Sequence, residues 1–248
     1  MIINAMRQHF DETDSTNRWL RDHIADCAHG FLVDADFQTA GKGQATNKWE
    51  SERGRNLLFS LLLEPTKIAL REQFLLSELV SLAMVDTLKR HLGCDVRIKW
   101  PNDIYVGDGK LCGILIETIV QGGAMAKAIV GIGLNVNQTV FTSDAPNPVS
   151  MKNIAGKTFD RVLILSDLHN AILNYYADFE PAAAAQVQQR YFAALYRNAG
   201  LHTYQLPDGT RFAAAIERVE PTGHLVLRDA DNRLRTFAFK EVQFVIAE

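Results

Sequence analysis

Two short segments bring a lysine, an asparagine and an aspartate into an apolar setting. Residues 99–103 read KWPND, and residues 110–117 read KLCGILIE. Charged side chains are rarely buried without a partner or a task. A glycine inside an apolar strand, here Gly113, often lets a ligand approach the backbone. Together with a glycine-rich, lysine-bearing loop upstream, the pattern indicates a site for a small acid and a nucleotide.

The turn at residues 107–109 joins the two segments into a predicted hairpin. With Tyr105 opposite Lys110, Asp103 lies opposite Cys112, and Asp103 and Lys110 share one face of the sheet. A slip of one residue would put the two charges on opposite faces. We predict the first register; a plain structural ion pair is the alternative to a functional one.

The upstream loop reads TAGKGQ at residues 39–44. Gly41 and Gly43 let backbone amides approach an anion, and Lys42 adds a positive charge. The loop lacks both the Walker A pattern and GxGxxG, so alone it is more typical of a surface turn. Its weight comes from the polar donors, cations and indole that follow: Asn47, Lys48, Trp49, Arg53 and Arg55. Trp49 either covers a flat or apolar ligand or belongs to the core.

A third segment, GIGLNVN at residues 131–137, combines two glycines with two asparagines at the end of a predicted strand. The glycines lower the side-chain bulk there. Asn135 and Asn137 either cap a turn or bind a ribose, a phosphate or a metal-bound water.

Hydrophobic periodicity and turn residues predict the elements that position these groups. Ser and Thr at 15 and 16 supply N-cap chemistry, and Gly93 follows the clearest helix as its C-cap. The predicted helices span residues 71–91, 162–179 and 182–196. The predicted strands span residues 31–37, 56–63, 96–100, 104–106, 111–120 and 126–137. Short turns between successive strands favour an α+β fold with a mixed, largely antiparallel sheet rather than a doubly wound parallel one.

The pattern changes at Gly200, beyond which short strands alternate with turns. They are predicted at residues 202–206, 211–219, 224–227, 235–239 and 242–246. We therefore predict a catalytic domain over residues 1–198 and a small C-terminal β-barrel over residues 199–248.

Composition excludes several classes of protein. A hydrophobic share of 47% supplies a core, and a net charge of -3 argues against a general nucleic-acid or membrane-surface binder. The three cysteines and seven histidines show no metal-ligand spacing, so a protein-bound metal is not expected. Cys112 is predicted to be a buried thiol rather than a nucleophile. Without a predicted membrane span or signal segment, we expect a cytoplasmic protein.

Five segments occur in the order seen in biotin protein ligases: DSTN at 14–17, QTAGKG at 38–43, KWPND at 99–103, KLCGILIE at 110–117 and GIGLN at 131–135. The chain resembles a biotin–[acetyl-CoA-carboxylase] ligase over about residues 8–140. The resemblance implies a class II synthetase-like catalytic domain with a C-terminal SH3-like barrel. It also implies two steps: biotin and ATP with magnesium give biotinyl-5'-AMP, and a lysine of a biotin carboxyl carrier domain then takes the biotin.

The same resemblance assigns roles to individual residues. Lys110 would offset the repulsion between the biotin carboxylate and the ATP α-phosphate. Asp103 would lie near the incoming amine, with a role as its base as a hypothesis. The residues implied for biotin binding are Ser15, Thr16, Asn17, Gln38, Gly41, Lys42, Gly43, Gln44, Trp49, Lys110 and Gly113. Those implied for nucleotide binding are Lys42, Lys48, Trp49, Asn102, Lys110 and Asn135.

The chain also differs from many of the biotin protein ligases that it resembles. Many relatives carry a run of arginines where this chain reads QATN at 44–47, which predicts a weaker hold on phosphate unless Lys48, Arg53 or Arg55 compensates. The DSTN motif begins so early that no DNA-binding domain is expected before it, and we predict neither nucleic-acid nor membrane binding. A homodimer is left open. The alternatives are a lipoate ligase or octanoyl transferase of the same fold and a non-catalytic biotin-binding module, with a DNA-binding repressor more distant.

Overall fold

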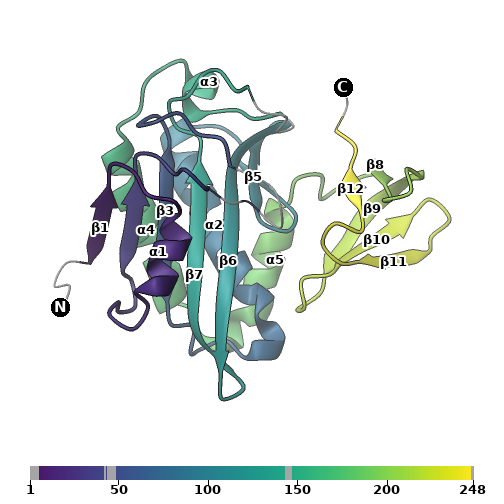
Figure 1. The fold of residues 1–248 in the computed structure, drawn as a ribbon. Coiled ribbons are helices and arrows are strands. Elements are labelled where there is room, and N and C mark those ends of the chain that lie inside the picture. The colour runs from purple at the N-terminus through teal and green to yellow at the C-terminus, as the bar shows by residue number, and fades with distance from the viewer. Residues whose placement is uncertain (1–5, 42, 44–48, 143–146, 247–248) are drawn as a thin grey trace.

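A computed structural model describes residues 6–41, 43, 49–142 and 147–246. The larger of its two sheets has seven strands in the order β1-β2-β3-β7-β6-β5-β4 (Figure 1). These strands are β1 Arg7–Phe10, β2 Leu32–Ala35, β3 Leu57–Leu63, β4 Arg97–Lys99, β5 Asp103–Val106, β6 Gly109–Gln121 and β7 Ala124–Leu134. Among these described strands, β1 and β2 pair in parallel and the other neighbours pair antiparallel, so the prediction of a mixed, largely antiparallel sheet is confirmed.

The helices lie on both faces of this sheet, as Figure 1 shows. The long helices α2, α4 and α5 cover one face, and the short helix α1 lies on the other. Their bounds are α1 Thr16–Asp22, α2 Phe74–Leu92, α3 Met151–Ala155, α4 Arg161–Ala177 and α5 Ala184–Ala194. Two 3₁₀ turns, η1 Leu70–Glu72 and η2 Pro181–Ala183, precede α2 and α5.

Local sequence explains where these helices begin and end. The Ser15 side chain accepts a hydrogen bond from the Arg18 amide and so caps α1, as predicted. Gly93 has a left-handed φ of 66° at the end of α2, a conformation that costs glycine no steric strain.

The core continues through both faces of the central strands. Phe59 and Leu61 of β3 belong to the main apolar cluster beneath the long helices. Leu62 and Ile129 pack instead with Leu20 of α1 in a second cluster. The all-apolar pattern around Ser60 in β3 therefore reflects a strand with packed layers on both sides.

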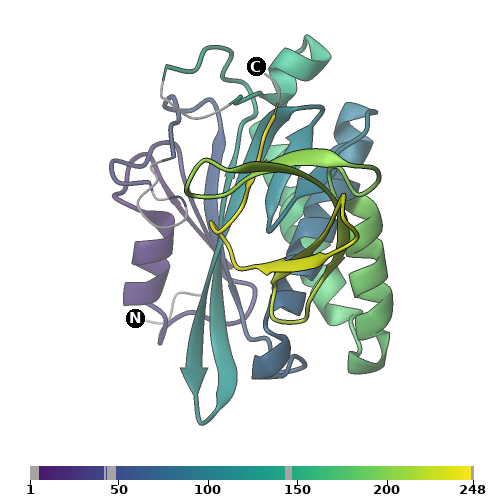
Figure 2. The same cartoon turned by 90° about the vertical axis from the view of Figure 1, so that its right-hand side faces the viewer.

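The second sheet is antiparallel, in the order β11-β10-β9-β8-β12, and curls beside the first (Figure 2). Its strands are β8 His202–Gln205, β9 Arg211–Val219, β10 Leu225–Asp229, β11 Leu234–Phe237 and β12 Gln243–Phe244. This agrees with the predicted C-terminal β domain; the exact boundary at residues 198 and 199 stays a prediction.

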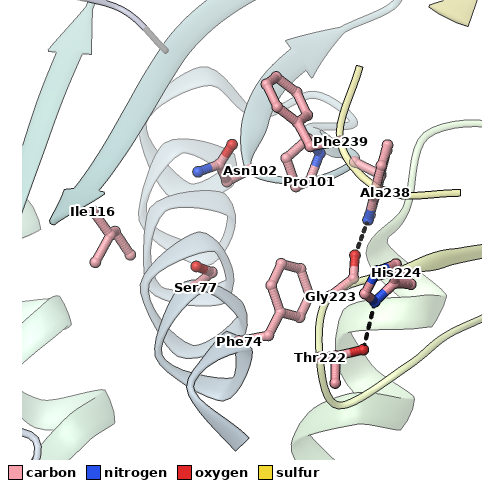
Figure 3. A pocket seen from close by; sticks show the side chains of 11 residues that line it. Phe74, Ser77, Pro101, Asn102, Ile116, Thr222, Gly223, His224, Ala238 and Phe239 are labelled. Carbon is pink, nitrogen blue, oxygen red and sulfur yellow. Dashed lines mark hydrogen bonds between the residues drawn. The ribbon is translucent and has the colours of Figure 1, made fainter. Parts of the chain in front are cut away.

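The two sheets meet at the KWPND turn. Trp100 Nε1 donates to the Gly223 carbonyl at 2.9 Å, and a Cβ at Gly223 would lie 2.7 Å from Phe74 of α2. A cavity of about 300 Å³ lies here, between Ser77 and Asn102 on one side and His224 on the other (Figure 3).

The predicted hairpin register is half right. Tyr105 pairs with Lys110 as predicted, but Ile104, not Asp103, pairs with Cys112. A bulge in β6 at Leu111 shifts the ladder by one residue, which simple alternation does not anticipate. Asp103 pairs with Lys99 of β4 on its other side.

In the part of the chain that the structure describes, no helix combines the length and apolarity needed to cross a membrane.

Candidate functional site

The Lys110–Asp103 pair lies at the centre of the predicted site. Lys110 Nζ is 2.6 Å from Asp103 Oδ2, and the two side chains are 27% and 23% exposed. This contact agrees with the prediction that the two side chains share one face of the sheet, despite the bulge. An ammonium has three donors, so Lys110 can keep this contact and still donate to a bound anion.

A polar cluster at the start of α1 lies on the same side of the sheet as Trp49. The Gln38 Oε1 accepts from the Thr16 amide at 2.7 Å and lies 3.1 Å from the Thr16 hydroxyl. Ser15 and Thr16 are buried. These residues offer hydroxyl and amide groups in a water-poor setting, which suits the recognition of a small polar ring.

Two glycines of adjacent strands form a flat patch between the polar cluster and Lys110. Gly113 pairs with Gly133, and a Cβ on either would lie 2.9 Å or 2.5 Å from the indole of Trp49. A side chain here would displace that ring, so the site requires both glycines. We predicted that Gly113 leaves space for biotin; the indole fills that space in this structure.

The glycine-rich loop begins and returns beside this patch. The Trp49 amide donates to the Gly41 carbonyl at 3.2 Å, and a Cβ at Gly41 would lie 3.3 Å from Gln38 Nε2. Gly43 is half-buried and outside any helix or strand. The predicted site residues Lys42, Gln44 and Lys48 lie outside the described residues.

Two buried polar atoms at the site have no hydrogen-bond partner within the described ranges: Trp49 Nε1 and Asn135 Oδ1. Asn135 Nδ2, by contrast, donates to the Val149 carbonyl at 3.1 Å. Buried polar groups in folded proteins are nearly always paired. One free donor and one free acceptor therefore fit a site that a polar ligand completes.

Asn102 is held by the backbone of β6. Its Nδ2 donates to the Ile114 carbonyl at 3.1 Å, and its side chain lines the cavity at the second sheet (Figure 3). Its predicted contact with a nucleotide stays a prediction.

Two of the three residues proposed to replace the missing arginines, Arg53 and Arg55, have other partners. Arg53 donates to the Asp11 carbonyl at 2.9 Å and pairs with Glu12. Arg55 lies 3.8 Å from Glu52. Both side chains are more than half exposed.

The sequence analysis assigned no role to three polar residues beside the site. Ser60 and Glu117 contact Asn17, whose amide is thus held on both sides. Lys99 lies 5.3 Å from the Tyr105 ring and 5.1 Å from the Phe244 ring, and burial lowers the pKa of its amine. A lone serine within the apolar run of β3 was a signal for the first of these.

Cys112 is fully buried, and burial raises the pKa of its thiol. The prediction of a structural thiol rather than a nucleophile fits this setting, since the reactive thiolate is disfavoured there.

Known structures share this fold. The biotin protein ligase from Aquifex aeolicus, solved in complex with biotin and ATP, superposes with a TM-score of 0.79 at 23% identity, covering 96% of this chain and 99% of that one. The biotin protein ligase from Leishmania major, in complex with biotinyl-5-AMP, gives a TM-score of 0.66 at 22% identity over 94% and 98% of the two chains. The architecture is thus that of the biotin protein ligase fold.

The sequence model of the biotin/lipoate A/B protein ligase family matches residues 9–135, and the chain belongs to this family. It is 36% identical over 160 residues to the bifunctional ligase/repressor BirA of Salmonella typhimurium, which is 62% of this chain and 48% of the relative. It is 29% identical over 227 residues to the biotin--[acetyl-CoA-carboxylase] ligase of Paracoccus denitrificans, which is 89% and 93%. The chain spans about half the length of the first curated relatives it matches.

Proposed function

We propose that the chain is an ATP-dependent ligase that forms biotinyl-5'-AMP and transfers the biotin to a lysine of a biotin carboxyl carrier domain. The observation that carries the proposal is the Lys110–Asp103 pair beside a glycine patch, next to a buried polar cluster, in a member of this ligase family. The relatives named as biotin ligases support biotin over lipoate.

In the first step, a carboxylate oxygen of biotin attacks the α-phosphorus of ATP. The bond from that phosphorus to the bridging oxygen breaks, and pyrophosphate leaves with the electron pair. Two unit negative charges about 4 Å apart repel by roughly 4 kcal/mol at an effective dielectric constant of about 20. The Lys110 ammonium offsets this repulsion and stabilises the charge that builds on the phosphoryl oxygens.

In the second step, the neutral amine of the carrier lysine attacks the acyl carbon. The acyl–oxygen bond breaks, AMP leaves, and the new amide nitrogen loses a proton. Asp103 is the base that we assign to that proton, because its carboxylate touches the same lysine that holds the adenylate. Magnesium enters with ATP as part of the substrate, and we assign no metal site to the protein.

The test is biotin-dependent exchange of pyrophosphate into ATP, followed by transfer of biotin to a carrier domain. Lys110→Ala should lower the exchange rate by about 100- to 1,000-fold, because it removes the positive charge at the reacting phosphate. Lys157→Ala, at an exposed lysine that lies over Phe159, is the control and should keep the wild-type rate.

Three outcomes would contradict the proposal. Exchange that depends on lipoate and not on biotin would assign the chain to the other branch of its family. Biotin binding without any exchange would make it a binding module. Normal exchange by Lys110→Ala would remove the assigned role of this lysine.

A further inference from the structure

A carboxylate on β6 reaches across the sheet to the helix that carries the polar cluster. Glu117 Oε2 accepts from Asn17 Nδ2 at 2.8 Å, although the two residues are 100 positions apart. Glu117 also forms an ion pair with Arg21, one helical turn beyond Asn17. One side chain therefore holds both turns of α1 against the sheet.

This contact fixes the orientation of the Asn17 amide. An ionised carboxylate only accepts hydrogen bonds, so the NH₂ end of Asn17 must face Glu117. The oxygen end then faces Ser60, whose Oγ lies 2.5 Å away. The backbone beneath leaves little room, because a Cβ at Gly131 would lie 2.2 Å from that oxygen.

The orientation of Asn17 in turn directs the protons of the neighbouring hydroxyls. Ser60 Oγ lies 2.5 Å from Asn17 Oδ1 and 2.7 Å from Thr16 Oγ1, and it has one proton to give. Asn17 Oδ1 has no proton, so the Ser60 proton goes there. The Thr16 proton then goes to Ser60 or to Gln38, and the lone pairs of Thr16 stay available to a ligand.

We infer that Glu117 is a positioning residue that keeps the Thr16 hydroxyl an acceptor and thereby selects a ligand that offers an N–H group at this point. The inference rests on the proposed function, in which the cyclic urea of biotin supplies two N–H groups. The dithiolane ring of lipoate has no N–H group, so an acceptor at Thr16 would disfavour lipoate.

The first test is Glu117→Gln. A glutamine offers both a donor and an acceptor, so the Asn17 amide is free to turn over and donate to Ser60. Ser60 would then donate to Thr16 and consume one of its lone pairs. The KM for biotin in the exchange assay should rise about tenfold, the value of one hydrogen bond. The kcat should change less than threefold, because Glu117 does not touch the reacting groups.

Glu217→Gln is the matched control. Glu217 also pairs with an arginine, Arg228, at 2.8 Å, but on the second sheet. It should leave the KM for biotin unchanged.

Adding Asn17→Asp to Glu117→Gln should restore the network. The new carboxylate accepts from the new amide, which reverses the wild-type hydrogen bond between these positions, and it also accepts from Ser60, as Asn17 Oδ1 does in the wild type. The double variant should return to within about threefold of the wild-type KM. Asn17→Asp alone sets two carboxylates against each other and should be the weakest binder.

Two carbamate analogues of biotin, each with an oxygen in place of one ureido N–H, test directly whether the site selects for an N–H group. The measurement is the affinity of each analogue relative to that of biotin. One of them should bind the wild type at least tenfold more weakly than biotin does, and Glu117→Gln should shrink that ratio. A structural role alone would lower thermal stability without changing the ratio.

The outcomes separate this inference from the proposed function. If the wild type shows no biotin-dependent exchange, the proposed function fails. If it shows exchange but Glu117→Gln keeps both its KM and its discrimination, or the double variant is not rescued, the positioning role of Glu117 is wrong.

Discussion

At the scale of single residues, the buried acid Glu78 lies outside the proposed site. Glu78, in the second turn of α2, is 1% exposed, and its Oε2 has no partner among the described residues. Burial raises the pKa of this carboxyl from an ordinary value near 4.5 to about 8. The folded protein therefore holds a proton there at neutral pH that the unfolded chain releases.

This difference predicts how stability depends on pH. Between about pH 4.5 and 8 the folded state binds more protons at Glu78, so the free energy of unfolding falls as pH rises. Below pH 4.5 both states are protonated and the effect vanishes. Glu78→Gln should therefore gain roughly 2–4 kcal/mol relative to the wild type between pH 4.5 and 7.5. Urea unfolding at both pH values measures this difference.

Glu72→Gln, at an acid whose side chain is 40% exposed just before the same helix, is the control and should follow the wild-type curve. Parallel curves for the wild type and Glu78→Gln would show that the carboxyl is not kept protonated by burial.

The scale of the elements shows what the sequence can and cannot predict. Apolar periodicity and cap residues predicted α2 and its end at Gly93, because burial and backbone conformation there are set locally. The Tyr105–Lys110 register followed from a short turn. The bulge at Leu111 did not, since it depends on how β5 and β6 fit the sheet as a whole rather than on a residue of special type.

The sequence patterns also did not predict the side-chain contacts between distant elements of the sheet and α1. Asn17 belonged to the predicted biotin-binding set, but its amide contacts Ser60 and Glu117, which lie 43 and 100 residues away. The DSTN motif gave no sign of these partners. Trp49 had two interpretations, ligand cover or core, and its indole lies on the glycine patch of the site.

The glycine patch itself allows a graded prediction. A Cβ at Gly133 would lie 2.5 Å from the Trp49 ring, and one at Gly113 2.9 Å. Gly133→Ala should therefore displace the indole more than Gly113→Ala. We expect the KM for biotin to rise at least tenfold for Gly133→Ala and less for Gly113→Ala, with a fluorescence shift of Trp49 in the same order.

The free energy of unfolding should change little in either variant, because alanine loses less backbone entropy on folding than glycine does. The reverse order of effects, or equal loss of stability and of biotin binding, would mean that the strands rather than the indole respond to the substitution.

At the scale of the whole molecule, the second sheet is joined to the site through the KWPND turn. In this turn, Trp100 Nε1 donates a hydrogen bond to the Gly223 carbonyl, and Lys99 Nζ lies over the Phe244 ring. The next strand, β5, begins at Asp103. The cavity of Figure 3 lies beside these contacts. The Trp100 hydrogen bond is thus a polar contact between the part that carries the proposed site and the C-terminal sheet.

Trp100→Phe tests this connection, because it keeps an aromatic ring and removes the Nε1 donor. The Gly223 carbonyl loses its partner, which should cost about 1–2 kcal/mol and loosen the C-terminal sheet. Protease cleavage within residues 195–201, between α5 and β8, should become several-fold faster. Trp19→Phe removes the same atoms from a ring that stacks on His23, the residue after α1, and it should leave this cleavage rate unchanged. Equal cleavage rates in the two variants would show that other contacts hold the second sheet in place.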